Sequence, residues 1–351
     1  MIEKICHIGP ALYVQGGISS VLVSYKKLFK LPEGNFIASY NGSFVKSLPV
    51  LFLLCLRLLI CPPSQFDFFQ IHTSSYGSFF RKYLISRCLR LRGRKYVCHI
   101  HGSLFDKFCN GAPSIVKLML KDYFVHSEKI FILSSEMKDI VRSVSPSSEN
   151  FVVIPNPGES IAGAPEDLSL HENPVKVIFS GRFGNRKGVY DLIEAFDKSS
   201  FSVPVELFLF GDGEVDKVRE CVEKSSKSSL ISVSPWMKHG DYIRQLPKYD
   251  LLVLPSYAER FSMSLVEALG FGLPVISTFV GGTAEVVEDG VCGILCEPGD
   301  ILALTKALET IVNDKALRLK MGKAGWERAS THFTGDVVKG CLERGYQDLL
   351  S

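Results

Sequence analysis

The segment VKVIFSGRFGNRKGVYDLIEAFDK (Val175–Lys198) decides the fold class, because it joins an apolar strand to an amphipathic helix through a basic turn. The same order recurs in VELFLFG with EVDKVRECVEK, and in DLLVLPS with the helical stretch after Phe261. Nearly continuous apolar strands that alternate with amphipathic helices are typical of a parallel sheet covered on both faces. This half of the chain is therefore predicted to be a doubly wound α/β domain.

The first half repeats this pattern less regularly. KICHIGP (Lys4–Pro10) predicts a buried strand, which a glycine-containing loop connects to a helix, and further strands are expected at FDFFQIH, KYVCHIHG, KIFILSS and NFVVIPNP. The polar stretch Asn156–Pro174, rich in Pro, Gly and Ser, is the natural linker. We predict two Rossmann-like domains facing each other across a cleft, residues 1–160 and 161–335, and a C-terminal helix over 336–351 that is free to pack back on the first domain.

The charges of the 351 residues are unevenly distributed. Residues 1–155 contain 19 Lys and Arg against 9 Asp and Glu, whereas the remainder contains 21 against 28. Such an asymmetry suggests that the first half meets something anionic, such as nucleic acid, a phosphorylated lipid or a membrane surface. The stretch RKYLISRCLRLRGRK is either a solvated basic helix face or a patch for anionic lipid or a lipid-diphosphate acceptor, and its cations are Arg81, Lys82, Arg87, Arg90, Arg92, Arg94 and Lys95. The charge of the whole domain favours the patch.

Several classes of protein are disfavoured by composition. No secretion signal is visible, and the ten cysteines contain no CxxC pair, so reduced thiols in a cytoplasmic protein are expected rather than a zinc ribbon or a redox site. The apolar stretch Leu48–Cys61 is too short to span a bilayer and is interrupted by Arg57. It could be a buried helix or one that lies in the membrane interface, and its apolarity all round favours buried packing.

The residues that follow strands are the first candidates for a site, because doubly wound domains bind ligands at the carboxyl ends of their strands. Arg182 and Lys187 lie between a strand and the next helix, where two cations and free N–H groups would suit a diphosphate, although a solvated basic turn is equally compatible. Glu259 follows another strand, and Ser262 and Ser264 open the next helix. Glu267, further along that helix, could accept two ribose hydroxyls; a capping acid and an exposed helix acid are the alternatives.

Together these segments resemble the retaining glycosyltransferases of family 4, which have the GT-B fold. Glu259, seven intervening residues and Glu267, followed by ALGFGLPVISTFVGGTAEVVEDGVCGILCEPGD, resemble that family's signature, and GRFGNRKG resembles its donor-diphosphate segment. GGI at Gly16–Ile18 resembles its N-terminal glycine loop, and HIHG resembles its acceptor-side histidine loop. The resemblance is strong from about Val175 to Asp300 and weak over the first domain.

The resemblance implies a catalytic set of His101, Arg182, Lys187 and Glu259. It also implies a donor-binding set of Gly16, Gly17, Phe261, Ser262, Met263, Ser264, Leu265 and Glu267. In that family the leaving diphosphate is stabilised by the two cations, Glu259 contacts the sugar, Glu267 holds the ribose, and His101 touches the sugar and orients the acceptor. Retention is thought to proceed by front-face attack, with a donor phosphate oxygen taking the acceptor proton, so charge stabilisation would supply most of the catalysis.

Some features depart from this pattern or point elsewhere. Arg260 stands where a small residue is common, and it could point to solvent or add a cation near the donor. No Asp-x-Asp motif occurs, so no metal and no other cofactor is expected, and GDGEVD lacks the third glycine of a dinucleotide loop. His99 and His101 face the same way on a strand and could bind a metal only with a third ligand, which the sequence does not identify. A core His99 and a functional His101 are expected instead.

We therefore expect a hexosyl-transferring, retaining enzyme that uses a nucleotide sugar such as a UDP- or GDP-sugar. Its acceptor would be a glycan, lipid-linked, in the biosynthesis of a cell-surface polysaccharide such as lipopolysaccharide or its O-antigen. The enzyme would be cytoplasmic and peripheral on the inner face of the membrane, with no nucleic acid as partner, since no recognition motif is present. The alternatives are a sugar-nucleotide epimerase of the same fold and a non-catalytic protein that binds a sugar or nucleotide.

Overall fold

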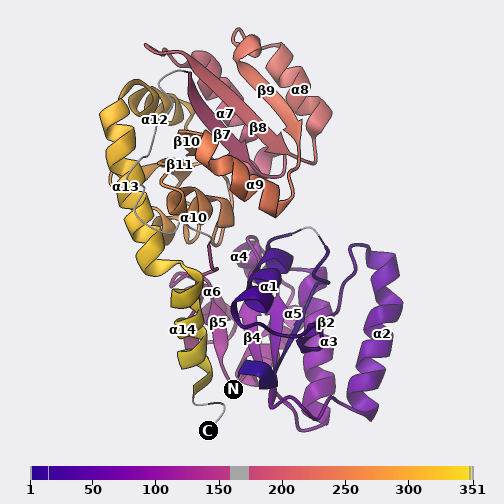
Figure 1. Cartoon of the computed structure of the whole chain (residues 1–351). Coiled ribbons are helices and arrows are strands. Elements are labelled where there is room, and N and C mark those ends of the chain that lie inside the picture. The colour runs from indigo at the N-terminus through magenta and orange to yellow at the C-terminus, as the bar shows by residue number, and fades with distance from the viewer. Residues whose placement is uncertain (1, 15, 159–173, 348, 350–351) are drawn as a thin grey trace. The chain divides into compact units, whose positions relative to one another are not determined.

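The computed structural model describes residues 2–14, 16–158, 174–347 and 349, and it divides the chain into two compact units (Figure 1). Unit 1 combines Met1–Pro157 with Gly335–Ser351, and unit 2 is Gly158–Thr334. Most of the predicted linker, residues 159–173, lies outside the described residues, and so does the predicted boundary at residue 160. Each unit contains a six-stranded sheet.

The sheet of unit 1 has the strand order β2-β1-β3-β4-β5-β6, and every pair of neighbours is parallel. Its strands are β1 (Ile5–Gly9), β2 (Phe36–Ala38), β3 (Phe68–Thr73), β4 (Lys95–Ile100), β5 (Ile130–Ile132) and β6 (Phe151–Val153). Every residue of β1 and β3 is buried, as expected for apolar strands with helices on both faces. The strand order reverses at β1, which places the β1 and β3 ends at a topological switch point.

Within the described residues, unit 1 has seven α-helices. They are α1 (Gly17–Leu28), α2 (Phe44–Ile60), α3 (Gly77–Leu91), α4 (Phe105–Asn110), α5 (Ser114–Val125), α6 (Met137–Val144) and α14 (Gly335–Gln347). The last helix contributes to the core of this unit, because Val338, Leu342 and Tyr346 are buried against Phe68 and Phe131. Unit 1 also has the short 3-10 helices η1 (Ile2–Lys4) and η2 (Glu33–Asn35).

The sheet of unit 2 has the order β12-β11-β10-β7-β8-β9 and is also fully parallel. Its strands are β7 (Val175–Ser180), β8 (Val205–Gly211), β9 (Ile231–Pro235), β10 (Leu251–Val253), β11 (Val275–Thr278) and β12 (Gly293–Cys296). This architecture confirms the predicted α/β class of two doubly wound domains. The adjacency of β7 and β10 matters most for the site, because it brings the loops after these two strands together.

Aspartate caps mark the starts of two long helices of unit 2. Asp300 and Asp314 each accept a hydrogen bond of 2.9 Å from the backbone N–H three residues later, which fixes the starts of α12 and α13. The helices are α7 (Val189–Lys198), α8 (Val215–Glu223), α9 (His239–Gln245), α10 (Met263–Gly270), α11 (Thr283–Val286), α12 (Ile301–Asn313) and α13 (Lys315–His332). The 3-10 helices are η3 (Asn185–Lys187), η4 (Ser228–Leu230) and η5 (Leu246–Lys248).

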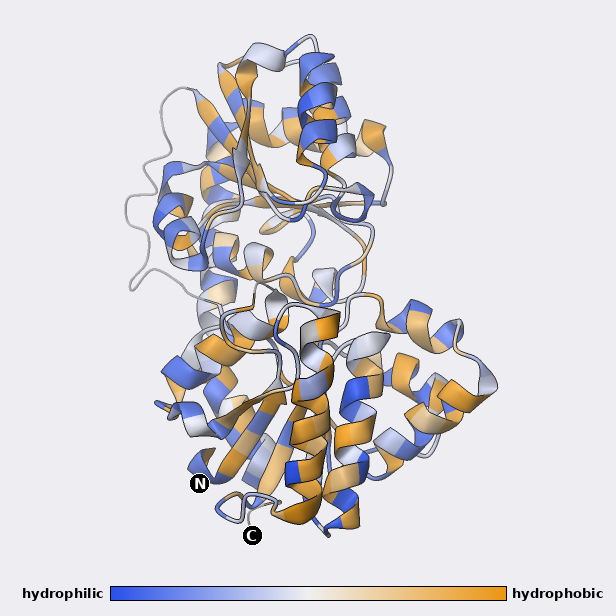
Figure 2. Ribbon diagram, turned by 90° about the vertical axis from the view of Figure 1, so that its right-hand side faces the viewer, coloured by the Kyte–Doolittle hydropathy of each residue, from blue (hydrophilic) through white to orange (hydrophobic). Residues whose placement is uncertain are grey.

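Helix α2 differs from the prediction. The expectation that Leu48–Cys61 is buried on all sides is wrong, because only one side of α2 packs on the protein: Leu58 is fully buried, whereas Phe52 is 68% exposed. The helix is nevertheless hydrophobic along nearly its whole length (Figure 2). We call its exposed apolar residues the α2 stripe, which comprises Val45, Leu48, Phe52, Leu53, Leu56, Leu59 and Ile60. Among the described residues, no helix has both the length and the apolarity needed to cross a bilayer.

Candidate active site

The loops after β7 and β10 meet in a buried ion pair. Lys187, the last residue of η3, donates from Nζ to Glu259 Oε1, and the two side chains are only 15% and 8% exposed. Ser256 donates from Oγ to the same carboxylate oxygen at 3.1 Å. The sequence analysis selected Lys187 and Glu259 separately; the structure shows that one holds the other. A carboxylate with two donors keeps a defined orientation, and a partly buried pair is weakly screened by solvent.

Two glycines allow these loops to approach so closely. Gly188 has φ +69°, and a Cβ on it would lie 1.9 Å from the carbonyl oxygen of Pro255. Gly281 has φ +52°, and a Cβ there would lie 1.9 Å from the carbonyl oxygen of Glu259. Each position combines a left-handed backbone with a contact that excludes any side chain. The loops after β7, β10 and β11 are therefore locked around Glu259.

Glu267 is held by a residue that the sequence analysis did not select. It lies in α10 and is 2% exposed, and its Oε1 is 2.6 Å from Nε2 of His239 at the start of α9. The side chain of His239 is itself 42% exposed, so its imidazole lies between the surface and the buried carboxylate of Glu267. The only sequence signal for His239 is that it follows strand β9, as the other candidate residues follow theirs.

The N-terminus of α10 lies between the two glutamates in sequence. Ser262 is its N-cap residue, with extended φ and ψ, and no side chain among the described residues caps the helix there. Phe261 packs edge-on against Phe333 at 5.4 Å between ring centroids, and Leu265 is fully buried, so only the backbone groups of these two residues could reach a ligand. Arg260 is 4% exposed, which rules out the solvent-facing alternative for this residue.

Arg182 and the glycine loop at Gly16–Gly17 were also selected from the sequence. Arg182 is exposed in the turn after β7, and it lies five residues before Lys187. In unit 1, Gly16 is the N-cap of α1 and has φ +151°, and a Cβ on either Gly16 or Gly17 would meet no described atom within 4 Å. The first turn of α1 therefore presents unobstructed backbone N–H groups.

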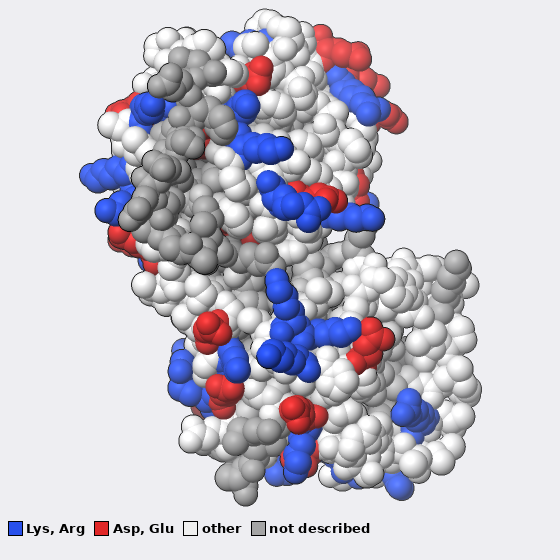
Figure 3. All heavy atoms as spheres, viewed as in Figure 1, with Lys and Arg blue, Asp and Glu red and all other residues white. Residues whose placement is uncertain are grey.

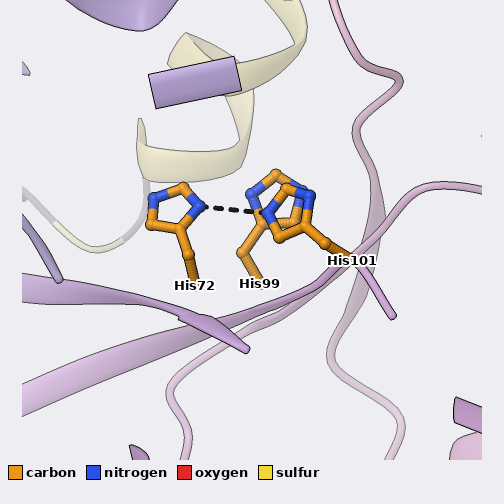
Figure 4. A group of neighbouring side chains, drawn as sticks. All are labelled: His72, His99 and His101. Atoms are coloured by element: carbon orange, nitrogen blue, oxygen red, sulfur yellow. Dashed lines mark hydrogen bonds between the residues drawn. The ribbon is translucent and has the colours of Figure 1, made fainter. Parts of the chain in front are cut away.

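His101 stands at the end of a chain of imidazoles inside unit 1. It directly follows β4, is partly exposed, and its Nε2 lies 3.0 Å from Nδ1 of His72 at the end of the neighbouring strand β3 (Figure 4). The Nε2 of His72 lies in turn 3.2 Å from Nδ1 of His7 in β1. His7 and His72 are fully buried, and burial lowers the pKa of His7 and of His101 to about 3. All three rings are therefore neutral at pH 7.

The chain of neutral rings allows only two arrangements of its protons, since each ring carries one. In the first, His7 donates from Nδ1 to His72, and His72 donates from Nδ1 to Nε2 of His101. In the second, both bonds run the other way, and Nε2 of His7 carries a hydrogen with no hydrogen-bond partner among the described residues. Buried N–H groups without a partner are rarer than buried acceptors. From the hydrogen-bond network we therefore assign the first arrangement, which leaves the proton of His101 on Nδ1.

The same histidines include the third ligand that the sequence did not identify for His99 and His101. His72, His99 and His101 each offer a ring nitrogen, and these atoms lie within 4.8 Å of one another. Neutral imidazoles can bind a transition metal. The hydrogen bond between His72 and His101 already accounts for their approach, however, and Gln70 binds Nδ1 of His99 at 2.9 Å and is itself bound by the hydroxyl of Tyr346. The arrangement thus consists of two hydrogen-bonded groups in the core, one of His7, His72 and His101 and one of Tyr346, Gln70 and His99.

The basic stretch of residues 81–95 does not form one surface. Lys82 is 1% exposed and donates to Ser39, and burial lowers its pKa to about 7, so its inclusion in a surface patch is wrong. Arg94 donates to the carbonyl oxygen of Phe66, and Arg90 pairs with Asp122 at 2.8 Å. The residues of this stretch that are exposed at the surface are Arg87, Arg92 and Lys95, whereas Arg81, Arg90 and Arg94 are partly buried.

Two doubly wound units with charged groups after their parallel strands define the GT-B class of architecture, and the comparison with solved structures agrees. The structure of HepE from Anabaena in complex with UDP-glucose superimposes with a TM-score of 0.73 at 19% identity, covering 97% of this chain and 98% of that one. Residues 163–328 match the family described as "Glycosyl transferases group 1". The matched residues lie within unit 2, so the similarity to this family is a property of that unit.

Curated relatives agree with this assignment. The glycogen synthase of Mycobacterium tuberculosis is 25% identical over 217 residues, which cover 60% of this chain and 52% of the relative. The capsular polysaccharide biosynthesis glycosyltransferase CapM of Staphylococcus aureus is 25% identical over 253 residues, covering 67% of this chain and 66% of the relative. The chain thus spans about half the length of the first of these relatives and about two thirds of the second.

Proposed function

We propose that this protein is a retaining glycosyltransferase that moves a hexosyl group from a nucleotide sugar to a glycan acceptor. The observation that carries the proposal is the buried pair of Lys187 and Glu259 at the ends of adjacent strands, inside the segment that matches the family. Such a pair leaves one cation and one carboxylate oriented in a loop cluster that glycines hold rigid. This is the kind of preorganised charge that a departing diphosphate requires.

The donor would be held mainly by unit 2. Arg182 and Lys187 would neutralise the diphosphate, with the N–H groups of Met263 and Ser264 at the start of α10, and the mostly exposed Gly16–Gly17 turn would contribute from unit 1. Glu259 would bind sugar hydroxyls. Glu267, whose orientation is fixed by the bond to His239, would bind the ribose hydroxyls. The UDP-glucose bound by HepE supports a nucleotide sugar such as a UDP- or GDP-sugar as donor.

The transfer step needs no side-chain nucleophile. The bond between the anomeric carbon and the diphosphate oxygen breaks, the acceptor hydroxyl oxygen bonds to that carbon on the same face, and the acceptor proton passes to an oxygen of the departing diphosphate. Retention of configuration follows from attack on that face. Because Nδ1 of His101 carries a proton, this residue would donate a hydrogen bond to the sugar rather than act as a base. We propose that the cations replace a metal ion, so activity should persist in EDTA.

The acceptor is proposed to be a lipid-linked glycan in the biosynthesis of a cell-surface polysaccharide such as O-antigen. Similarity to CapM supports the polysaccharide, and the excess of Lys and Arg in residues 1–155 supports an anionic acceptor at the inner face of the cytoplasmic membrane. The diphosphate of a lipid carrier would supply that anionic group.

A donor screen tests the proposal. Thermal stabilisation would be recorded with UDP-, GDP-, dTDP-, ADP- and CMP-sugars for the wild type and for Glu267→Ala. We expect one nucleotide class to stabilise the wild type and to lose its effect in the variant. Stabilisation without product in the presence of acceptors would favour a binding protein, and a changed sugar on the same nucleotide would favour an epimerase. An equal response of the wild type and Glu267→Ala would remove Glu267 from the site.

A further inference from the structure

The α2 stripe is the least explained feature of unit 1. At about 100° per residue, its seven positions fall within one arc of about 140°. In that arc the only other residue is Pro49, so no charged or hydrogen-bonding side chain interrupts it. The opposite side of the helix contains Leu54 and Leu58 and is buried. These side chains are each between 37% and 73% exposed and form one apolar patch, and in soluble proteins such patches mark contacts with proteins or membranes.

The charges around the stripe are cationic. Helices α2 and α3 contain six Lys and Arg and no acid, but Lys82 is buried and Arg90 pairs with Asp122 of α5. Arg57 is exposed and lies about 40° beyond the edge of the stripe. Helix α3 packs against α2 and exposes Arg87, which pairs with Asp122 of α5 at 3.4 Å, and Arg92 lies exposed just beyond the end of α3. The surface over α2 is mostly uncharged in the view of Figure 3.

We propose that the α2 stripe docks unit 1 on a bilayer that contains anionic lipid, with α2 lying in the plane of the interface. This inference rests on the membrane contact proposed above and names the surface that makes it. The helix is too short to span, as stated above, whereas an apolar stripe with cations at its edge is the pattern of interfacial helices. A partner protein fits less well, because protein interfaces are only about 56–65% non-polar and include polar groups.

Vesicle flotation tests the inference. The full chain would be mixed with vesicles made of equal parts phosphatidylglycerol and phosphatidylethanolamine, or of phosphatidylcholine alone. We expect binding to the anionic vesicles, weaker binding to phosphatidylcholine, and a loss of about tenfold in the partition coefficient for Phe52→Glu/Leu56→Glu. Phe52→Gln/Leu56→Gln should lose most of the same binding, because the apolar contact is removed without adding charge.

The matched control is Leu302→Glu, which changes a leucine of α12 in unit 2 that is 65% exposed. Its vesicle binding should equal that of the wild type. Equal binding of the wild type and both α2 variants, or no binding by the wild type, would overturn the inference. So would a wild-type dimer in analytical ultracentrifugation that becomes monomeric in the α2 variants, because the stripe would then be an interface between two copies.

Donor stabilisation measured on the same variants separates this inference from the proposed function. The stripe residues lie on α2, and no residue proposed to bind the donor belongs to that helix. Loss of vesicle binding with unchanged stabilisation by the nucleotide sugar is the expected result. If the nucleotide sugar stabilises neither the wild type nor the variants, the proposed function fails. The vesicle result would still decide whether the α2 stripe is a docking surface.

Discussion

Replacing His72 should change the tautomer of His101, and the choice of amide should decide in which direction. In His72→Asn the side-chain amide can take the place of Nδ1 and still donate to Nε2 of His101. In His72→Gln the amide reaches the place of Nε2 instead, so the bond to His7 survives and the 3.0 Å bond to His101 is lost. Each variant therefore loses one of the two hydrogen bonds of this buried ring.

The magnitude follows from the energy of one hydrogen bond. A neutral hydrogen bond contributes about 0.5–1.5 kcal/mol, which corresponds to a factor of about 2 to 13 in the ratio of the two His101 tautomers. Both variants should lose similar stability, about 1–3 kcal/mol, because each leaves one buried polar group unsatisfied. Stability thus cannot distinguish them, but the position of the proton can.

The assay is a long-range ¹H–¹⁵N correlation spectrum of protein labelled at the histidine nitrogens. In the wild type and in His72→Asn, the proton of His101 should be on Nδ1. In His72→Gln it should move towards Nε2, the tautomer that isolated histidine prefers. A wild-type spectrum with the proton on Nε2, or identical tautomer ratios in the two variants, would refute the assigned direction of the chain.

Three further predictions concern stability, pH and the ion pair. Gly281→Ala should lower the free energy of unfolding by about 1–3 kcal/mol in urea titrations and weaken stabilisation by the donor, because the new Cβ would lie 1.9 Å from the carbonyl oxygen of Glu259. The control is Gly290→Ala, which measures backbone strain alone, because residue 290 has φ +72° but open space around it. Equal losses of stability in the two variants would contradict the close approach of residue 281 to Glu259. Burial lowers the pKa of His7, His72, His99 and His101, so the unfolded chain binds more protons than the native one below about pH 6.5. The free energy of unfolding should therefore be highest above that pH and fall towards pH 3, by up to about 1.4 kcal/mol per pH unit for each histidine. His7→Phe should show a shallower dependence of stability on pH. Lys187→Met should lower the free energy of unfolding by about 3 kcal/mol, because it leaves Glu259 buried without its cation. The double variant Lys187→Met/Glu259→Gln should recover part of that stability. If the stability losses of the two single variants simply add in the double variant, the two side chains do not interact.

The sequence alone was sufficient for the fold class and for most strands, because each apolar run with a following amphipathic helix can form only a covered parallel strand. It also located Lys187, Glu259, Glu267 and His101 after their strands, since strand ends are recognisable locally. It could not pair them. The adjacency of β7 with β10, and of β3 with β4, is a property of the folded sheet, and only that adjacency joins Lys187 to Glu259 and His72 to His101.

Helix α2 shows the limit most clearly. Its sequence is apolar on every side, and composition cannot tell a helix surrounded by protein from one covered on a single side. Packing decides this, because α3 packs against one side of α2 and no further described element covers the stripe. Likewise, the basic stretch was evident from sequence, but the fold buried Lys82 and paired Arg90 with Asp122. Local chemistry determined the elements of this protein, and long-range contacts determined which side chains remained available for function.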